Sequence, residues 1–177
     1  MVTSKDTALA DPIRLIISDV DGVLSDGRIT LDNSGIESKS FHVRDGLGIK
    51  LWQRCGFHFA ILTARNSQVV KLRAAELGVA MVRQGFSDKL PAAREIMSEL
   101  GVTPAETCYI GDDLPDLPPM YEVALPVAVG DAAEEVRKAA TWTTHANGGQ
   151  GAVRELVRRI LAAKGRWDDC VPRPPAN

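Results

Sequence analysis

The sequence predicts an α/β fold: a doubly wound parallel sheet with helices on both faces. Two observations support this prediction. Short apolar runs rich in β-branched residues alternate with helical patterns, and they lie at positions 13–18, 57–62, 79–82, 107–110 and 125–129. The first run is almost continuously apolar, as expected of a strand that is buried on both faces. A chain of 177 residues has the size of a single domain with a substantial core.

A β-hairpin is expected directly after the first strand. Residues 28–31 and 37–43 alternate between apolar and polar side chains, and a turn signal at residues 32–35 separates them.

Four helical patterns follow the hairpin. Residues 47–55, 68–77 and 90–100 repeat apolar side chains at helical spacing. The second and third patterns end at Gly78 and Gly101, which suit the C-terminal cap of a helix. A last amphipathic helix is predicted from Val153, Leu156, Val157, Ile160 and Leu161.

The chain is expected to form one domain with flexible ends. Residues 13–167 contain all the predicted strands and helices. Residues 1–12 begin with a polar segment, lack the apolar stretch of a signal peptide and are expected to be a flexible N-terminus. Residues 168–177 are rich in proline and are expected to be a flexible C-terminal tail.

Composition argues against several classes of partner. The net charge of −2 gives no indication of a nucleic-acid partner. No apolar run approaches transmembrane length, so no membrane partner is expected either. Cys55, Cys108 and Cys170 are odd in number, far apart and without a C-x-x-C motif. We therefore expect reduced thiols in a cytoplasmic protein.

Two carboxylates leave the predicted end of the first strand. Asp19 and Asp21 are separated by one residue, and Gly22 allows a sharp turn behind them. Ligands of open α/β sheets bind at the carboxyl ends of strands. Like charges placed there are costly unless a cation or a reaction uses them. The alternative interpretation is a solvated turn.

Three later segments resemble further parts of one enzyme superfamily. Residues 59–65 form a strand pattern with Thr63 at its end, and residues 85–89 lead into a helix with Lys89. Residues 109–116 form another strand pattern, which ends in the acids Asp112, Asp113 and Asp116. In this order, and together with the first acid pair, the segments resemble the haloacid-dehalogenase superfamily of phosphoryl-transfer enzymes. The resemblance implies the Rossmann-like fold of that superfamily, whose members often carry a separate cap domain over the active site. This chain has no room for such a domain, so only the hairpin at residues 28–43 could act as a small flap.

The resemblance also implies catalytic roles. Asp19 would attack phosphorus and form an aspartyl-phosphate, and Asp21 would act as general acid and base. Thr63 and Lys89 would bind and neutralise the phosphate. Mg²⁺ suits carboxylates that face a phosphate, and its implied ligands are Asp19, Asp21 and Asp112. Asp113 is left open as a neighbour of this site, and Asp116 as a possible N-cap of a helix.

A narrower resemblance covers residues 13–167. The segments 19–27, 42–46, 85–89 and 148–155, together with the missing cap, resemble the family of 3-deoxy-D-manno-octulosonate 8-phosphate phosphatases. The family implies a step in lipopolysaccharide precursor synthesis and a homotetramer whose subunits cover one another's active sites. The segment 148–151 is either an ordinary loop before a helix or a closure of an active site. The implied substrate contacts are Asp21, His42, Val43, Arg44, Asp45, Gly46, Lys50, Arg65, Arg73 and Lys89.

Other functions stay open at this point. A phosphatase of a nine-carbon sugar acid 9-phosphate would share the same motifs. A phosphorylatable receiver domain also uses an acid pair, a Thr and a Lys, but it places its phosphorylated aspartate in mid-chain. A non-catalytic scaffold would not need Asp19, Asp21, Thr63, Lys89 and Asp112 intact.

Overall fold

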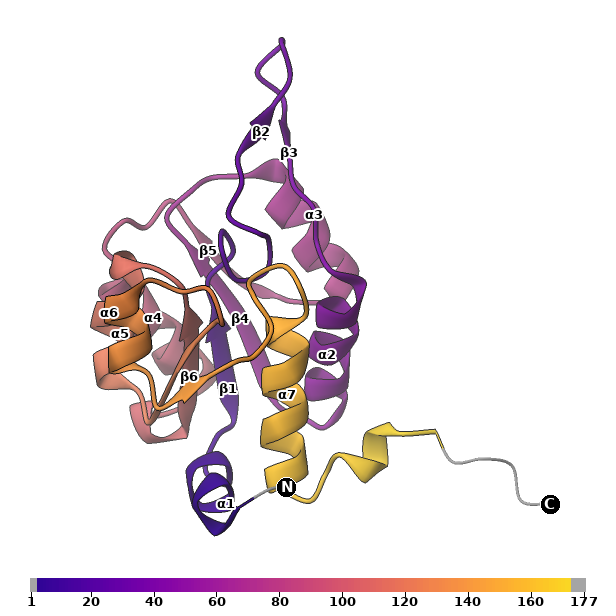
Figure 1. Ribbon diagram of the computed structural model, residues 1–177, viewed down its shortest axis with the longest axis vertical. Coiled ribbons are helices and arrows are strands. Elements are labelled where there is room, and N and C mark those ends of the chain that lie inside the picture. The colour runs from indigo at the N-terminus through magenta and orange to yellow at the C-terminus, as the bar shows by residue number, and fades with distance from the viewer. Residues whose placement is uncertain (1–2, 173–177) are drawn as a thin grey trace, which may run out of the picture.

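The computed structural model describes residues 3–172, and its centre is a six-stranded parallel sheet (Figure 1). The strand order is β5-β4-β1-β6-β7-β8. The strands are β1 (Leu15–Ser18), β4 (His58–Thr63), β5 (Met81–Gln84), β6 (Thr107–Gly111), β7 (Leu125–Ala128) and β8 (Trp142–Thr143). β1 lies in the middle, where it pairs in parallel with β4 and β6. The predicted doubly wound parallel sheet is confirmed.

Helices cover both faces of this sheet, on opposite sides in Figure 1. One side carries α2 (Val43–Arg54), α3 (Gln68–Leu77) and α7 (Ala152–Ala163). The other carries α4 (Lys89–Leu100), α5 (Leu117–Glu122) and α6 (Glu134–Ala139). Three short 3₁₀ turns are η1 (Pro104–Glu106), η2 (Leu114–Asp116) and η3 (Asp168–Cys170). The helix α3 begins where the Ser67 hydroxyl accepts a hydrogen bond from the Val70 N–H, and it ends at Gly78, whose φ is +70°.

The core is built around β1. Leu15, Ile16 and Ile17 are fully buried, because helices cover both faces of the central strand. Each such side chain contributes about 1.5–3 kcal/mol through burial. The helix α7 packs against α2 with Leu156, Val157 and Ile160 buried, so this layer holds the first helix after the hairpin in place.

The predicted hairpin is present but short. It consists of β2 (Thr30–Leu31) and β3 (Glu37–Ser38), and it projects beyond the carboxyl ends of the strands at the top of Figure 1. The strand pattern at residues 37–43 does not continue in the structure, because His42 already caps α2. Ile29, Leu31 and Ile36 on the hairpin are exposed. No separate cap domain occurs among residues 3–172.

Both ends that we expected to be flexible contain short helical elements. We expected residues 1–12 to be flexible, but Ser4–Ala10 form helix α1. Thr3 and Asp6 form a capping box, and Asp6 accepts a hydrogen bond of 2.7 Å from Arg159 of α7. At the other end, η3 lies within the predicted flexible tail, while residues 173–177 lie outside the described part of the chain.

None of the helices in the described residues combines the length and apolar character that spanning a bilayer would require.

Candidate active site

Two acids meet at the carboxyl edge of the sheet. Asp19 follows β1 and Asp112 follows β6, and these two strands are neighbours. The Asp19 N–H donates to the Ile110 carbonyl at 3.1 Å, which continues the ladder beyond the last paired residue. The side chains of residues that follow adjacent parallel strands therefore come together at this edge.

Gly22 allows the two acidic loops to approach closely. Its φ is +94°, and a Cβ atom at this position would lie 2.0 Å from Oδ2 of Asp112. Any other residue would be strained and would displace the Asp112 carboxylate. The glycine after the first acid pair is therefore required by the position of the second acid.

A cleft opens at this edge of the sheet, and its lining includes Asp19, Asp112 and Asp116. The carboxylates of these three residues form one cluster. Oxygen atoms of Asp19, Asp112 and Asp116 all lie within 4.8 Å of one another. The third carboxylate of this cluster is Asp116, whereas the carboxylate of Asp21, the other Mg²⁺ ligand expected from the family resemblance, is not part of it. Asp21 lies at the rim of the same cleft, and its carboxylate pairs with basic residues instead.

Asp116 is already satisfied by protein groups. Its Oδ1 accepts from Lys89 at 2.7 Å and from the Tyr109 hydroxyl at 2.8 Å, and its Oδ2 accepts from the N–H of Asp112 at 2.9 Å. It is fully buried, and its side chain makes no capping hydrogen bond to α5. Asp116 therefore fixes Lys89 and the loop after β6, a role that local sequence did not reveal.

Asp19 and Asp112 retain free acceptor capacity. Within residues 3–172, Oδ1 of Asp112 is buried and has no hydrogen-bond partner, and Oδ1 of Asp19 has only an ion pair with Lys89 at 3.0 Å, without hydrogen-bond geometry. Burial and then the charge of Asp116 raise the pKa of Asp19 to about 6. Burial and then the charge of Asp19 raise the pKa of Asp112 to about 8. Two unpaired, hard oxygen donors of this kind fit a divalent cation such as Mg²⁺.

Thr63 and Lys89 complete the predicted catalytic set. Thr63 is the last residue of β4, and Lys89 is the first of α4, so both reach the same edge as the acids. Both side chains are buried and line the cleft. Burial alone would lower the pKa of Lys89, but the charges of Asp19 and Asp116 raise it above its ordinary value. Lys89 is therefore a fixed positive charge beside Asp19.

Comparison with known proteins identifies the family. The family model for haloacid dehalogenase-like hydrolases matches residues 75–156. The 3-deoxy-D-manno-octulosonate 8-phosphate phosphatase of Salmonella typhi is 45% identical over 160 residues, which cover 90% of this chain and 85% of the relative. The chain belongs to the 3-deoxy-D-manno-octulosonate 8-phosphate phosphatase family of haloacid dehalogenase-like hydrolases. As a member of this family, it is a phosphoric monoester hydrolase.

Solved structures agree with this assignment. A crystal structure of the 3-deoxy-D-manno-octulosonate 8-phosphate phosphatase from Yersinia pestis superimposes with a TM-score of 0.92 at 43% identity, covering 94% of this chain and 90% of that one. The corresponding enzyme of Moraxella catarrhalis, in complex with a magnesium ion, a phosphate ion and a KDO molecule, gives a TM-score of 0.91 at 40% identity. That match covers 94% of this chain and 96% of the other.

Asp21 of this phosphatase contacts two cations at the rim of the cleft. Its Oδ1 pairs with Lys39, which follows the hairpin, and its Oδ2 lies 3.8 Å from Nε of Arg65. Arg65 was predicted from the sequence, and it lines the same cleft. Lys39 was not predicted, because nothing in the alternating pattern of the hairpin marks this lysine from its neighbours.

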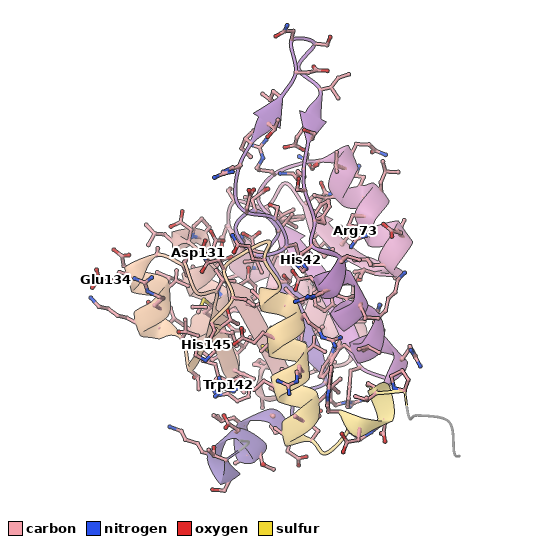
Figure 2. The ribbon with its side chains drawn as sticks, turned by 45° about the vertical axis from the view of Figure 1, so that its right-hand side comes forward. His42, Arg73, Asp131, Glu134, Trp142 and His145 are labelled. Atoms are coloured by element: carbon pink, nitrogen blue, oxygen red, sulfur yellow. The ribbon has the colours of Figure 1, made fainter. Side chains whose placement is uncertain are left out.

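Four other predicted substrate residues of the phosphatase lie elsewhere. His42, Asp45, Gly46 and Arg73 line a small, mostly apolar cavity between α2 and α3 and do not line the acidic cleft. Figure 2 shows His42 at the start of α2 and Arg73 on α3. Nη1 of Arg73 bonds to Glu76 at 2.7 Å, and a Cβ atom on Gly46 would lie 2.5 Å from Nη2 of Arg73. The absence of a side chain at Gly46 therefore makes room for Arg73.

Asp45 acts within the protein. It is 2% exposed, and its carboxylate accepts hydrogen bonds from the N–H groups of Gly151 at 3.2 Å and Arg154 at 2.7 Å. Gly151 is the N-cap of α7 and has no side chain to cap it. Asp45 therefore caps α7 from a different helix.

The remaining predicted contacts of the phosphatase are on the surface. Val43, Arg44 and Lys50 are exposed side chains on α2. The described chain by itself does not bring them to the acidic cleft.

The loop before α7 packs on the turn that follows Asp19 and Asp21. The Gly149 N–H donates to the Val23 carbonyl at 2.9 Å, and the Gly148 N–H donates to Asp131 at 2.9 Å. This loop therefore packs against residues 21–23 of its own chain and supports their position.

Proposed function

We propose that this enzyme is a Mg²⁺-dependent phosphatase that hydrolyses 3-deoxy-D-manno-octulosonate 8-phosphate to the free sugar acid and phosphate, in lipopolysaccharide precursor synthesis. The main observation in support of this reaction type is that one cleft is lined by Asp19, Asp21, Thr63, Lys89 and Asp112. The substrate is supported by relatives of that name at 45% identity over 90% of the chain.

Asp19 is the proposed nucleophile. One of its carboxylate oxygens attacks phosphorus, the bond between phosphorus and the sugar oxygen breaks, and an aspartyl-phosphate forms. Asp21 gives its proton to the departing sugar oxygen. Asp21 then takes a proton from water, whose oxygen attacks phosphorus and releases Asp19 and inorganic phosphate.

Positive charge and hydroxyl donors stabilise the phosphoryl group in this proposal. Lys89 lies 3.0 Å from Asp19, so its ammonium is positioned for an oxygen of a phosphate that Asp19 attacks. Thr63 offers a buried hydroxyl from the neighbouring strand. Asp19 and Asp112 would hold the Mg²⁺ ion, which neutralises charge on the phosphate when bound. The Mg²⁺ in the Moraxella catarrhalis complex supports this choice of metal.

A homotetramer is part of the proposal. Ile29, Leu31 and Ile36 on the hairpin are 45%, 58% and 65% exposed, which is unfavourable for an isolated chain. Arg44 and Lys50 are exposed and do not line the acidic cleft of their own chain, so their side chains are available to contact a neighbouring subunit. We also propose a cytoplasmic location, in keeping with three cysteines that form no disulfide within residues 3–172.

Phosphate release tests this proposal. The purified enzyme should release phosphate from 3-deoxy-D-manno-octulosonate 8-phosphate with Mg²⁺ and not after chelation. A nine-carbon sugar acid 9-phosphate and common sugar phosphates serve as comparison substrates. A higher kcat/KM for the nine-carbon acid would replace the proposed substrate, and no release from any monoester would contradict the reaction.

Sedimentation across a dilution series, with turnover measured in parallel, tests the assembly. We expect activity to fall as the tetramer dissociates. A monomer with full activity would contradict the shared active site.

A further inference from the structure

Lys39 is a buried cation beside the proposed general acid. Its side chain is 0% exposed, which is rare for lysine unless the ammonium group is paired. The ammonium pairs with Oδ1 of Asp21 and lies 3.3 Å from Oε1 of Glu37. Lys39 follows β3 directly, so the hairpin places a charged group against Asp21, which lines the acidic cleft.

Glu37 anchors the hairpin to the loop after β4. Its Oε1 accepts from Arg65 at 3.0 Å, and its Oε2 accepts from the Ser67 hydroxyl at 2.5 Å. The bond from Ser67 is the main cause that holds the pKa of Glu37 below its ordinary value. Lys39 lies one residue beyond the end of β3, and the ion pair between its ammonium and Oε1 of Glu37 places the two side chains on the same side of the hairpin. Glu37 therefore fixes the ammonium of Lys39 against Asp21.

We propose that Lys39 is a positioning residue that holds the Asp21 carboxyl group where the leaving oxygen is protonated. This inference rests on the role of Asp21 in the proposed function. Lys89 already supplies the cation next to Asp19, at 3.0 Å, so phosphate binding does not require Lys39. Lys39 instead contacts the acid that lies farther out on the cleft rim.

A comparison of two leaving groups distinguishes a positioning role of Lys39 from a structural role or a role in substrate binding. A sugar alkoxide is a poor leaving group and needs the proton of Asp21, whereas p-nitrophenolate leaves without one. The ratio kcat/KM reports the steps up to departure of the leaving group and is independent of the later hydrolysis of the aspartyl-phosphate. A displaced Asp21 should therefore lower kcat/KM for an alkyl phosphate much more than for p-nitrophenyl phosphate.

The experiment compares Lys39→Met with wild type on 3-deoxy-D-manno-octulosonate 8-phosphate and on p-nitrophenyl phosphate. We expect the fall in kcat/KM to be at least about 10-fold larger for the sugar phosphate. Lys39→Arg keeps the positive charge and should show a smaller difference between the two substrates than Lys39→Met. Glu37→Gln should also lower kcat/KM more for the sugar phosphate than for p-nitrophenyl phosphate, but by less than Lys39→Met. Lys71→Met, which removes an exposed lysine, is the matched control.

Two results would overturn the proposal. An equal fall for both substrates would assign Lys39 to the structure of the hairpin, and a rise in KM alone would assign it to substrate binding. If Lys39→Met does not fold, the fall in kcat/KM for the two substrates is compared in Glu37→Gln and Lys39→Arg instead. If wild type prefers another alkyl phosphate, the proposed substrate fails, and the test of Lys39 proceeds with that alkyl phosphate.

Discussion

Gly148 lies against the backbone of Gly22, so close that a Cβ atom on Gly148 would be 1.8 Å from the Gly22 carbonyl oxygen. Gly22 is the residue that follows the acid pair, and its lack of a side chain leaves room for the Asp112 carboxylate. The loop before α7 and the turn at residues 21–23 can therefore pack this closely only because both contact positions, far apart in the sequence, are glycines.

Replacing Gly148 should disturb catalysis. In Gly148→Ala the new methyl group must displace the turn at Gly22, because backbone atoms cannot move aside as a side chain does. We expect kcat to fall by about 10-fold or more, since small displacements of catalytic groups are costly. Steady-state kinetics and circular dichroism measure the effect.

Gly151→Ala is the matched control in the same loop. Gly151 has open space around it but a φ of +106°, so alanine would add backbone strain without a clash. We expect it to lower the free energy of unfolding by about 1–2 kcal/mol and to leave kcat near wild type. Equal activity of both variants would show that the contact between Gly148 and Gly22 is unimportant for the reaction.

Asp19→Asn should abolish turnover while the fold is retained. The amide has nearly the same shape but cannot attack phosphorus, so we expect a loss of about 10³-fold or more. Circular dichroism and phosphate release from the same preparation separate folding from chemistry. Asp88→Asn is a suitable control, because Asp88 is exposed and makes no capping hydrogen bond. Substantial activity in Asp19→Asn would exclude the covalent mechanism.

Stability should depend on pH and on Mg²⁺ together. The pKa values of Asp19 and Asp112 are raised to about 6 and about 8, above their ordinary value of 3.8. Without metal, the folded protein keeps protons that the unfolded chain has lost, so their contribution to stability falls as pH rises from about 4 to about 8. Mg²⁺ binds the ionised carboxylates, so the increase in Tm that it causes should grow between about pH 6 and pH 8.

Thermal unfolding with EDTA or with Mg²⁺, across this pH range, measures that difference. Asp112→Asn is the control, since an amide does not titrate and should flatten the dependence. A Mg²⁺-induced shift in Tm that is the same at pH 6 and pH 8 would argue against Asp19 and Asp112 as the metal ligands.

Asp45 should matter for stability more than for substrate binding. Asp45→Ala removes the acceptor for the N–H groups of Gly151 and Arg154 and should cost about 1–2 kcal/mol of unfolding free energy. Asp45→Asn keeps one acceptor oxygen and should cost less. Denaturant unfolding, with KM measured in parallel, tests this. A raised KM at unchanged stability would instead return Asp45 to the substrate contacts implied by the family resemblance.

Local pattern was sufficient for much of the fold. The apolar runs predicted five of the six sheet strands. Four of them, β1, β4, β6 and β7, are buried on both faces and need almost continuous apolar sequence, whereas the half-buried edge strand β5 overlaps its predicted run only in part. The short helices α5 and α6 and the strand β8 were missed. Segments of two to six residues are too short for a periodicity to be detected.

The sequence by itself determined that Asp19, Thr63, Lys89 and Asp112 would meet, because parallel strands end at a common edge and motif order assigns each residue to one strand or helix start. Only the tertiary structure decided that Asp116 joins the acid cluster, that Lys39 pairs with Asp21, and that Asp45 caps α7. The physical reason is distance along the chain. Asp45 and Arg154 are separated by 109 residues, and Lys39 and Asp21 by 18, so no local periodicity relates them. Such contacts form only when packed helices and the hairpin bring polar groups together and exclude the water that would otherwise solvate them.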